Sequence, residues 1–239
     1  MNDLHEIKQK TQQDYSAISQ LYIADFGSNH THFELIDKLI GIIRERRLLL
    51  RPTIDLGSGP GTIVDYLIKK GLWKVIAVDI TPEFCDYMRE KFKNLEGAFV
   101  DILEGDMVEL MQKELQGWRG YTAAITAGFS IIHIPDNEVD GLLKNIYDLL
   151  FAGGVFYMSC HEGTSKGMEL EPYTNQKDKR FKTHERFEVY MNYFTEEELR
   201  TRIEKVGFEI IDLIRYEPDI LPGEIPVAKL QVLAQKPLK

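Results

Sequence analysis

The stretch Thr53-Ile54-Asp55-Leu56-Gly57-Ser58-Gly59-Pro60-Gly61-Thr62 decides the fold of this chain. Its apolar start is typical of a buried strand, and it runs directly into three glycines at alternate positions. Glycine tolerates left-handed backbone conformations and lets a ligand approach the main chain closely. A helix expected over 62–70 would point its first N–H groups at whatever the turn holds. The stretch therefore predicts a ligand-binding turn between a strand and a helix.

Strand-like and helix-like segments alternate from this turn onward, which is typical of right-handed crossover units and a parallel sheet covered on both faces. Strands are expected over 53–56, 74–79, 98–103, 122–127 and 154–160, and helices over 62–70, 82–93, 107–115 and 136–150.

The end of the chain departs from this alternation. Gly153-Gly154 is expected to stop the helix that begins at 136, and a helix over 195–206 is capped by Thr195 and ended by Gly207. Strands over 208–216 and 227–235 then follow with no helix between them. A hairpin-like pair of strands is therefore expected to close the sheet.

Two further parts flank the alternating region. Amphipathic helices over 14–24 and 32–47 are expected to form a cap within residues 1–50. Residues 161–193 lack periodicity, which is typical of an insertion or lid over an active site. No repeat or Pro/Ser-rich linker divides the chain, so residues 1–239 are interpreted as a single domain. Within 177–186 the basic residues outnumber the acids, as in a solvated face or a surface for an anionic substrate.

Composition and charge exclude several classes of protein. With 44% hydrophobic residues, the chain can bury a full core, and a net charge of -9 opposes binding to nucleic acid. Neither a signal peptide nor a membrane-spanning run is visible, so a cytoplasmic protein without a membrane partner is expected. Cys85 and Cys160 lie in apolar contexts without CxxC spacing, which favours reduced, buried thiols and no metal site. The oligomeric state is left open.

The spacing of the glycines separates two classes of cofactor that use such a turn, dinucleotides and adenosyl compounds. The dinucleotide fingerprint G-x-G-x-x-G needs its third glycine at position 62, but the chain has Thr62 there and Gly61 before it. The second strand ends at Asp79, whose carboxylate can accept hydrogen bonds from ribose hydroxyls. Gly105-Asp106-Met107 follows the third strand, and Asp106 can accept a hydrogen bond from an exocyclic amine. This order favours an adenosyl compound.

Taken in order, I54-D-L-G-S-G-P-G61, A77-V-D79 and E104-G-D-M107 resemble the motifs of class I S-adenosylmethionine-dependent methyltransferases. F151-A-G-G-V-F156 and residues 193–210 are similar to that family's turn before its fifth strand and to its late helix and sixth strand. The resemblance implies an α/β, Rossmann-like, mostly parallel seven-stranded sheet with an antiparallel last strand and helices on both faces. It also implies S-adenosylmethionine as cofactor and S-adenosylhomocysteine as product.

The resemblance further implies which residues bind the cofactor. The glycine turn would hold the methionine moiety, Asp79 the ribose, and Asp106 with Met107 the adenine. The residues at the end of the fourth strand and just after it would lie beside the sulfur of the cofactor. The complete set of expected cofactor-binding residues is Tyr22, Asp55, Gly57, Ser58, Gly59, Gly61, Thr62, Asp79, Ile80, Gly105, Asp106, Met107, Ala127, Gly128 and Ser130.

His133 and His161 are the candidate catalytic residues, because they follow the fourth and fifth strands at the edge where chemistry would occur. A histidine among Ile131, Ile132 and Ile134 is also typical of a packing residue. The function expected from the resemblance is methyl transfer to a small molecule by in-line displacement, a reaction that gains chiefly from holding its reactants aligned. A non-catalytic adenosyl-binding module and an NAD(P)-dependent Rossmann oxidoreductase stay open as alternatives.

Overall fold

The fold is seen in a computed structural model that describes residues 2–28, 32–171, 187–218 and 225–238. The basic stretch 177–186, interpreted from the sequence as a solvated face or an anion-binding surface, lies outside these residues. The elements follow one another as α1 (Asn2–Phe26), α2 (Glu34–Glu45), β1 (Thr53–Leu56), α3 (Thr62–Lys69), β2 (Lys74–Asp79), α4 (Pro82–Lys91), β3 (Phe99–Glu104), α5 (Met107–Gln112), η1 (Glu114–Trp118), β4 (Thr122–Gly128), η2 (Ile131–His133), α6 (Asp136–Leu149), β5 (Leu150–His161), β6 (Lys166–Leu170), β7 (Glu188–Asn192), α7 (Glu196–Val206), β8 (Glu209–Tyr216) and β9 (Lys229–Gln235).

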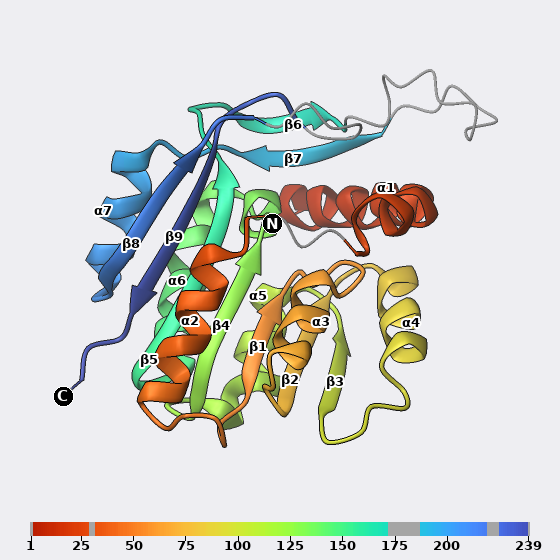
Figure 1. Ribbon diagram of the computed structural model, residues 1–239. Helices are drawn as coiled ribbons and strands as arrows, with labels where there is room; N and C mark the ends of the chain where they lie inside the picture. Colours follow the sequence, from red (N-terminus) through yellow and green to blue (C-terminus); the bar gives the residue numbers. More distant parts are fainter. Residues whose placement is uncertain (1, 29–31, 172–186, 219–224, 239) are drawn as a thin grey trace.

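Seven of the strands form one sheet in the order β3-β2-β1-β4-β5-β9-β8 (Figure 1). The first five pair in parallel, whereas β9 is antiparallel to both β5 and β8. The predicted Rossmann-like sheet with an antiparallel last strand is therefore confirmed. The order in which successive strands are added to the sheet reverses between β1 and β4. Ligands of open α/β sheets bind at the carboxyl ends of the strands beside such a reversal.

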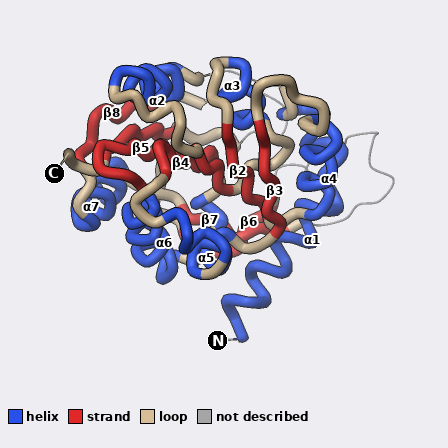
Figure 2. The backbone as a smooth tube through the Cα atoms, turned by 90° about the horizontal axis from the view of Figure 1, so that it is seen from below, coloured by secondary structure: helices blue, strands red, loops and turns tan. Residues whose placement is uncertain are grey.

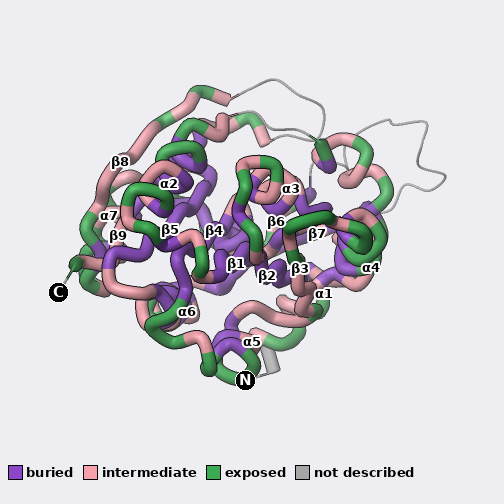
Figure 3. Tube along the Cα trace, turned by 60° about the horizontal axis from the view of Figure 1, so that its bottom comes forward, coloured by how far each residue is buried: buried purple, intermediate pink, exposed green. Residues whose placement is uncertain are grey.

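Helices cover both faces of this sheet, as Figure 2 shows from below. Strand β2 illustrates why, because its side chains alternate between two apolar clusters: Val75 and Ala77 pack with α2, α3 and α4, whereas Ile76 and Val78 pack with α5, α6 and α7. Strands buried on both faces are near-continuous apolar runs, which is the pattern of β1, β2 and β4. The buried residues accordingly follow the central strands (Figure 3).

The two N-terminal helices occupy different places. Helix α2 packs on one face of the sheet, whereas α1 crosses above the carboxyl ends of the strands, between them and β6–β7 (Figure 1). Hydrogen bonds hold α1 there: Gln12 donates to the Ile80 carbonyl oxygen at 2.8 Å, and the Phe26 carbonyl oxygen accepts from Thr62 at 2.8 Å. Helix α1 thus closes the edge of the sheet at which the glycine turn lies.

One sequence-based expectation was wrong. Helix α6 ends at Leu149 and β5 begins at once, so Gly153-Gly154 lies inside a strand rather than ending the helix. The pairing of β5 with β4 shifts register there, and Gly153, at φ 79°, supplies the left-handed residue of the irregularity. The tract 161–193 also contains regular structure, because β6 and β7 form a separate antiparallel pair with Gly167 opposite Met191.

The two cysteine thiols lie apart from any disulfide. Both cysteines are free and buried, and burial raises the pKa of the Cys85 thiol to about 12. Within the described ranges, no helix combines the length and the apolar character needed to cross a membrane. The same ranges hold no group of three or more side chains suited to a metal ion.

Candidate active site

The glycine turn has the left-handed backbone that its sequence suggests. Gly57, Gly59 and Gly61 have φ values of 64°, 51° and 74°. A Cβ atom on Gly57 would lie 2.3 Å from the Cβ of Ser130, so this glycine lets β1 approach the segment after β4. A Cβ on Gly59 would meet only the Tyr22 ring, at 3.8 Å, and would otherwise extend into open space. The turn therefore leaves room for a ligand at Gly59.

Gly61 serves a different purpose from the other two glycines. It is the N-cap residue of α3, and a Cβ there would lie 2.9 Å from the Phe92 ring and about 3 Å from the Met88 side chain. It lines neither of the cavities at the carboxyl edge. Packing between the turn and α4 accounts for this glycine.

Asp79 ties the turn to the end of β2. Its carboxylate accepts hydrogen bonds from the Gly59 N–H at 2.7 Å and from the Thr81 N–H at 2.8 Å. Burial raises the pKa of Asp79, against the effect of these hydrogen bonds. The Thr81 hydroxyl and the Ile80 N–H also donate hydrogen bonds that act on this carboxylate. Asp79 lines one of the cavities at the carboxyl edge of the sheet.

Asp106 is both a helix cap and part of an ion pair. One carboxylate oxygen accepts from the Val108 N–H at 2.8 Å, and the other lies 2.6 Å from Nζ of Lys8. Lys8 also lies 2.7 Å from Glu138. Burial lowers the pKa of Lys8, but the two carboxylates outweigh it and raise this pKa overall. The ion pair anchors the start of α1 beside the cavity that Asp106 lines.

Asp55 carries a buried oxygen that lacks a partner. Its Oδ1 accepts a hydrogen bond from the Thr126 hydroxyl at 2.6 Å. Its Oδ2 has no hydrogen-bond partner among the described residues, although it is buried. Burial raises the pKa of Asp55 to about 7, against the hydrogen bond from Thr126. The Ser58 hydroxyl donates instead to the backbone carbonyl oxygen of Asp55, at 2.9 Å. An unsatisfied buried oxygen is costly in free energy, so it marks a position at which a cationic donor would be stabilised.

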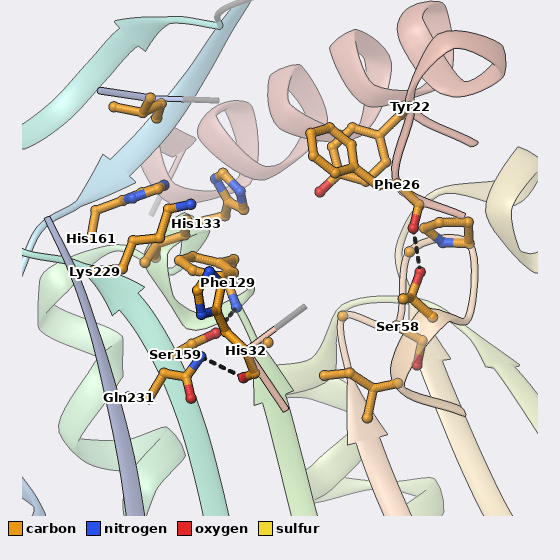
Figure 4. A pocket seen from close by; sticks show the side chains of 18 of the residues that line it. Tyr22, Phe26, His32, Ser58, Phe129, His133, Ser159, His161, Lys229 and Gln231 are labelled. Carbon is orange, nitrogen blue, oxygen red and sulfur yellow. Dashed lines mark hydrogen bonds between the residues drawn. The ribbon is translucent and has the colours of Figure 1, made fainter. Parts of the chain in front are cut away.

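Two adjoining cavities lie under α1, and both are lined by Tyr15, Tyr22, Gly57, Gly59, Gly128, Phe129 and His133. The smaller, here called the β2–β3 cavity, has a volume of about 100 Å³ and reaches Asp79 and Asp106. The larger, here called the β5–β9 cavity, has a volume of about 220 Å³ and reaches Ser159, His161, Lys229 and Gln231 (Figure 4).

Most of the expected cofactor-binding residues line one of these cavities. Asp55, Ser58 and Thr62 face the β5–β9 cavity; Asp79, Ile80, Gly105, Asp106, Met107 and Ser130 face the β2–β3 cavity; and Tyr22, Gly57, Gly59 and Gly128 face both. Ala127 lines neither and is fully buried in the core beside α6.

His133 is a satisfied, buried residue. Its Nδ1 lies 2.9 Å from the Tyr190 carbonyl oxygen, which can only accept, so Nδ1 carries the proton. Its Nε2, 2.9 Å from the Tyr15 hydroxyl, then accepts a hydrogen bond from that hydroxyl. Burial lowers the pKa of His133 to about 4. The side chain therefore orients Tyr15, which faces both cavities, and has no lone pair to spare for a substrate.

His161 is also buried, but unlike His133 it has a ring nitrogen without a hydrogen-bond partner among the described residues. It is 7% exposed and faces the β5–β9 cavity, and its Nδ1 has no hydrogen-bond partner among the described residues. Burial is the main cause that lowers the pKa of His161 to about 3, and the positive charge on Lys229 makes a smaller contribution in the same direction. His161 is therefore a neutral imidazole with an unsatisfied nitrogen.

Sequence reasoning missed Phe129 and the polar side chains of β9. Phe129 has φ 51°, a left-handed conformation that is rare for a bulky residue and typical of functional sites. Its N–H donates to the Ser159 hydroxyl at 3.0 Å. Lys229 and Gln231 are buried and alternate with apolar residues at the start of β9, and a lysine and a glutamine in such a strand are the signal that could have identified them.

Known proteins that are similar to this chain include methyltransferases. Glycine N-methyltransferase from Rattus norvegicus is 26% identical over 144 residues, which cover 57% of this chain and 47% of that protein. The chain thus spans about half the length of this curated relative. A 1,6-didemethyltoxoflavin-N1-methyltransferase from Burkholderia thailandensis, solved with its substrate and S-adenosylhomocysteine, superposes with a TM-score of 0.63 at 20% identity, over 98% of this chain and 90% of that one.

A SAM-dependent methyltransferase from Methanosarcina mazei has the same fold, with a TM-score of 0.62 at 19% identity over 79% of this chain and 93% of that one. Residues 54–154, which run from β1 into β5 and include the glycine turn, Asp79 and Asp106, match the family model described as a methyltransferase domain. Over residues 54–154 the chain is thus similar to methyltransferase domains, and it shares the fold of solved S-adenosylmethionine-dependent methyltransferases.

Proposed function

We propose that this chain transfers a methyl group from S-adenosylmethionine to a small-molecule acceptor in the β5–β9 cavity. The observation that carries the proposal is the buried, unsatisfied Oδ2 of Asp55 beside the open face of Gly59. A cationic amine at this position would give Oδ2 the partner that it lacks. The amino group at the methionine end of the cofactor has this chemistry, so the residues present fit the group.

The β2–β3 cavity fits the other end of the same molecule. Asp79 at the end of β2 would accept from the ribose hydroxyls, while Gly59 and Thr81 hold its carboxylate in place. Asp106 would accept from the adenine amine, and the apolar side chains of Met107 and Phe84 would cover the ring. The shared residues Gly57, Gly128 and Phe129 would then lie where the two cavities meet, which is where the sulfur would be held.

When bound, the cofactor supplies an electrophilic methyl group on a positively charged sulfur. The chain's own residues align the acceptor with that group, since alignment is the chief source of rate in such a displacement. Phe129 and Tyr15 would exclude water from the junction of the cavities, and His133 would keep Tyr15 in position. The unsatisfied Nδ1 of His161 would accept a hydrogen bond from an O–H or N–H of the acceptor and so orient it.

A small acceptor is supported by how the cavity is closed. Helix α1 and strand β7 cover it, since Tyr15 and Tyr22 of α1 and Val189 and Met191 of β7 line it. Glycine N-methyltransferase and 1,6-didemethyltoxoflavin-N1-methyltransferase are both named for small acceptors, which agrees with a site covered in this way.

The proposal is tested by incubating the protein with methyl-labelled S-adenosylmethionine and a panel of small acceptors that includes amines, phenols and carboxylic acids. We expect S-adenosylhomocysteine to form only when protein and an accepted panel member are both present. Release of that product should be lost in Asp79→Ala but kept in Asp86→Ala, because Asp86 is an exposed acid of α4 outside both cavities. Tight cofactor binding without turnover of any panel member would instead identify a non-catalytic adenosyl-binding module.

A further inference from the structure

A ladder of polar side chains crosses β5 and β9 on the face that lines the β5–β9 cavity. His161 is the direct cross-strand partner of Lys229, and Ser159 is that of Gln231. Because side chains alternate along a strand, these four residues lie on one face and their side chains are neighbours. All four are buried, with exposed fractions of 8% or less, and all four line the cavity. Figure 4 shows them together on one side of the cavity.

Two buried polar atoms of this ladder lack partners among the described residues. Gln231 donates from Nε2 to the His32 carbonyl oxygen at 2.9 Å, which fixes its amide and directs Oε1 elsewhere. Oε1 of Gln231 and Nδ1 of His161 are both unsatisfied. Since burying such atoms is costly, a ligand that donates hydrogen bonds would be stabilised here. Lys229 is the cross-strand partner of His161 and lies two residues before Gln231 on the same face, where it adds a positive charge.

Rings form much of the rest of this cavity. Its lining includes Phe129, Tyr157, Tyr216, His32 and Phe33 near the ladder. The rings of Phe129 and His161 lie 5.1 Å apart at an interplanar angle of 36°, and Nζ of Lys229 lies 5.8 Å from the Phe129 ring centroid. Both Phe129 and His32 have left-handed backbone conformations, at φ 51° and 59°. Strain of this kind at two lining residues indicates that the rings are held in place for a ligand.

We infer that the methyl acceptor is a planar ring that carries an acidic oxygen with an adjacent O–H or N–H, bound with the oxygen toward Lys229 and the donor toward His161 and Gln231. This inference rests on the proposed function, because it names the acceptor of that same site. The ring would stack against Phe129, and the polar ladder would recognise its edge. Asp55 and Glu171 are the acids among the lining residues, and the carboxylate of Glu171 opposes an anionic ligand.

The test measures binding to the protein saturated with S-adenosylhomocysteine, by isothermal titration. The probes are 2-hydroxybenzoate and 2-aminobenzoate, their amides, and the saturated cis-2-hydroxycyclohexanecarboxylate. We expect a ring acid to bind at least about tenfold more tightly than its amide and than the saturated acid. Lys229→Met should remove the preference over the amide, Glu171→Gln should strengthen binding of the ring acid, and Lys93→Met, an exposed lysine beside Glu90, should change neither.

Equal binding of acid and amide, a preference that survives Lys229→Met, or no binding of either ring acid would overturn the inference. Circular dichroism of each variant checks that it is folded. The result is separable from the proposed function: S-adenosylhomocysteine binding without a ring-acid preference refutes only the acceptor class, whereas no S-adenosylhomocysteine binding refutes the proposed function itself.

Discussion

The Tyr15 hydroxyl of α1 donates a hydrogen bond to Nε2 of His133, 2.9 Å away and 118 positions later in the sequence. His133 in turn donates from Nδ1 to the Tyr190 carbonyl oxygen of β7. One imidazole thus joins the helix that closes the site, the turn after β4, and the strand pair above them. The arrangement fixes Tyr15 over the junction of the two cavities.

Tyr15→Phe tests this link. The ring contacts to Tyr22 and Phe84 would remain, but Nε2 of the buried His133 would lose its donor. We expect the free energy of unfolding to fall by about 1–3 kcal/mol, the usual cost of an unsatisfied buried group. Urea denaturation measures this change. Tyr121→Phe, at an exposed tyrosine, is the control and should be nearly neutral; equal losses in the two variants would contradict the link.

The buried carboxyl of Asp55 predicts a pH dependence of cofactor binding. Burial raises its pKa to about 7, so in the free protein it is largely protonated below that pH. A bound ammonium group favours the carboxylate, and binding below pH 7 must therefore release a proton. The affinity for S-adenosylhomocysteine should rise with pH up to about 7 and then level off.

Asp55→Asn should weaken binding and flatten this pH profile. Asp79, whose pKa burial also raises, contributes a dependence of the same sign, so some slope is expected to remain in the variant. Titrations of both proteins in the same buffers between roughly pH 5.5 and 7.5 measure the effect. An affinity that falls as the pH rises over this range would show that Asp55 does not meet the cation.

Gly59→Ala separates backbone strain from loss of ligand space. Gly97 offers a matched control, because it also has positive φ, at 75° against 51°, and a Cβ there would meet nothing within 4 Å. Alanine at either position should lower stability by about 1 kcal/mol, the cost of a left-handed L-residue. Only Gly59→Ala should also weaken S-adenosylhomocysteine binding, by about tenfold or more. Comparable binding by both variants would mean that the cofactor does not approach Gly59.

The sequence signals for a cofactor site are local. Gly57, Gly59, Asp79 and Asp106 lie at the ends of strands or in the turns that follow them, and the ends of parallel strands meet at one edge of the sheet. Gly61 shows what such local signals leave out. An alternate glycine in the turn does not reveal that Met88 and Phe92 approach it from α4.

The polar lining of the β5–β9 cavity could not be predicted, because it depends on pairing between distant segments. Ser159 and His161 meet Gln231 and Lys229 only through the β5–β9 register, about 70 residues apart in the sequence. The role of His133 likewise depends on Tyr15 and Tyr190, which reach it from α1 and β7. The β6–β7 pair was missed because two five-residue strands give little periodicity.

Titration calorimetry with S-adenosylhomocysteine is the decisive measurement of whether the carboxylates at the ends of the strands bind an adenosyl amino acid. We expect one site per chain, with Asp79→Ala weakening binding by about 1.5–3 kcal/mol, because ribose hydroxyls would lose a charged acceptor. The matched variant Asp86→Ala should bind like the wild type. Absence of heat from wild-type protein, or equal affinities of the two variants, would contradict the account.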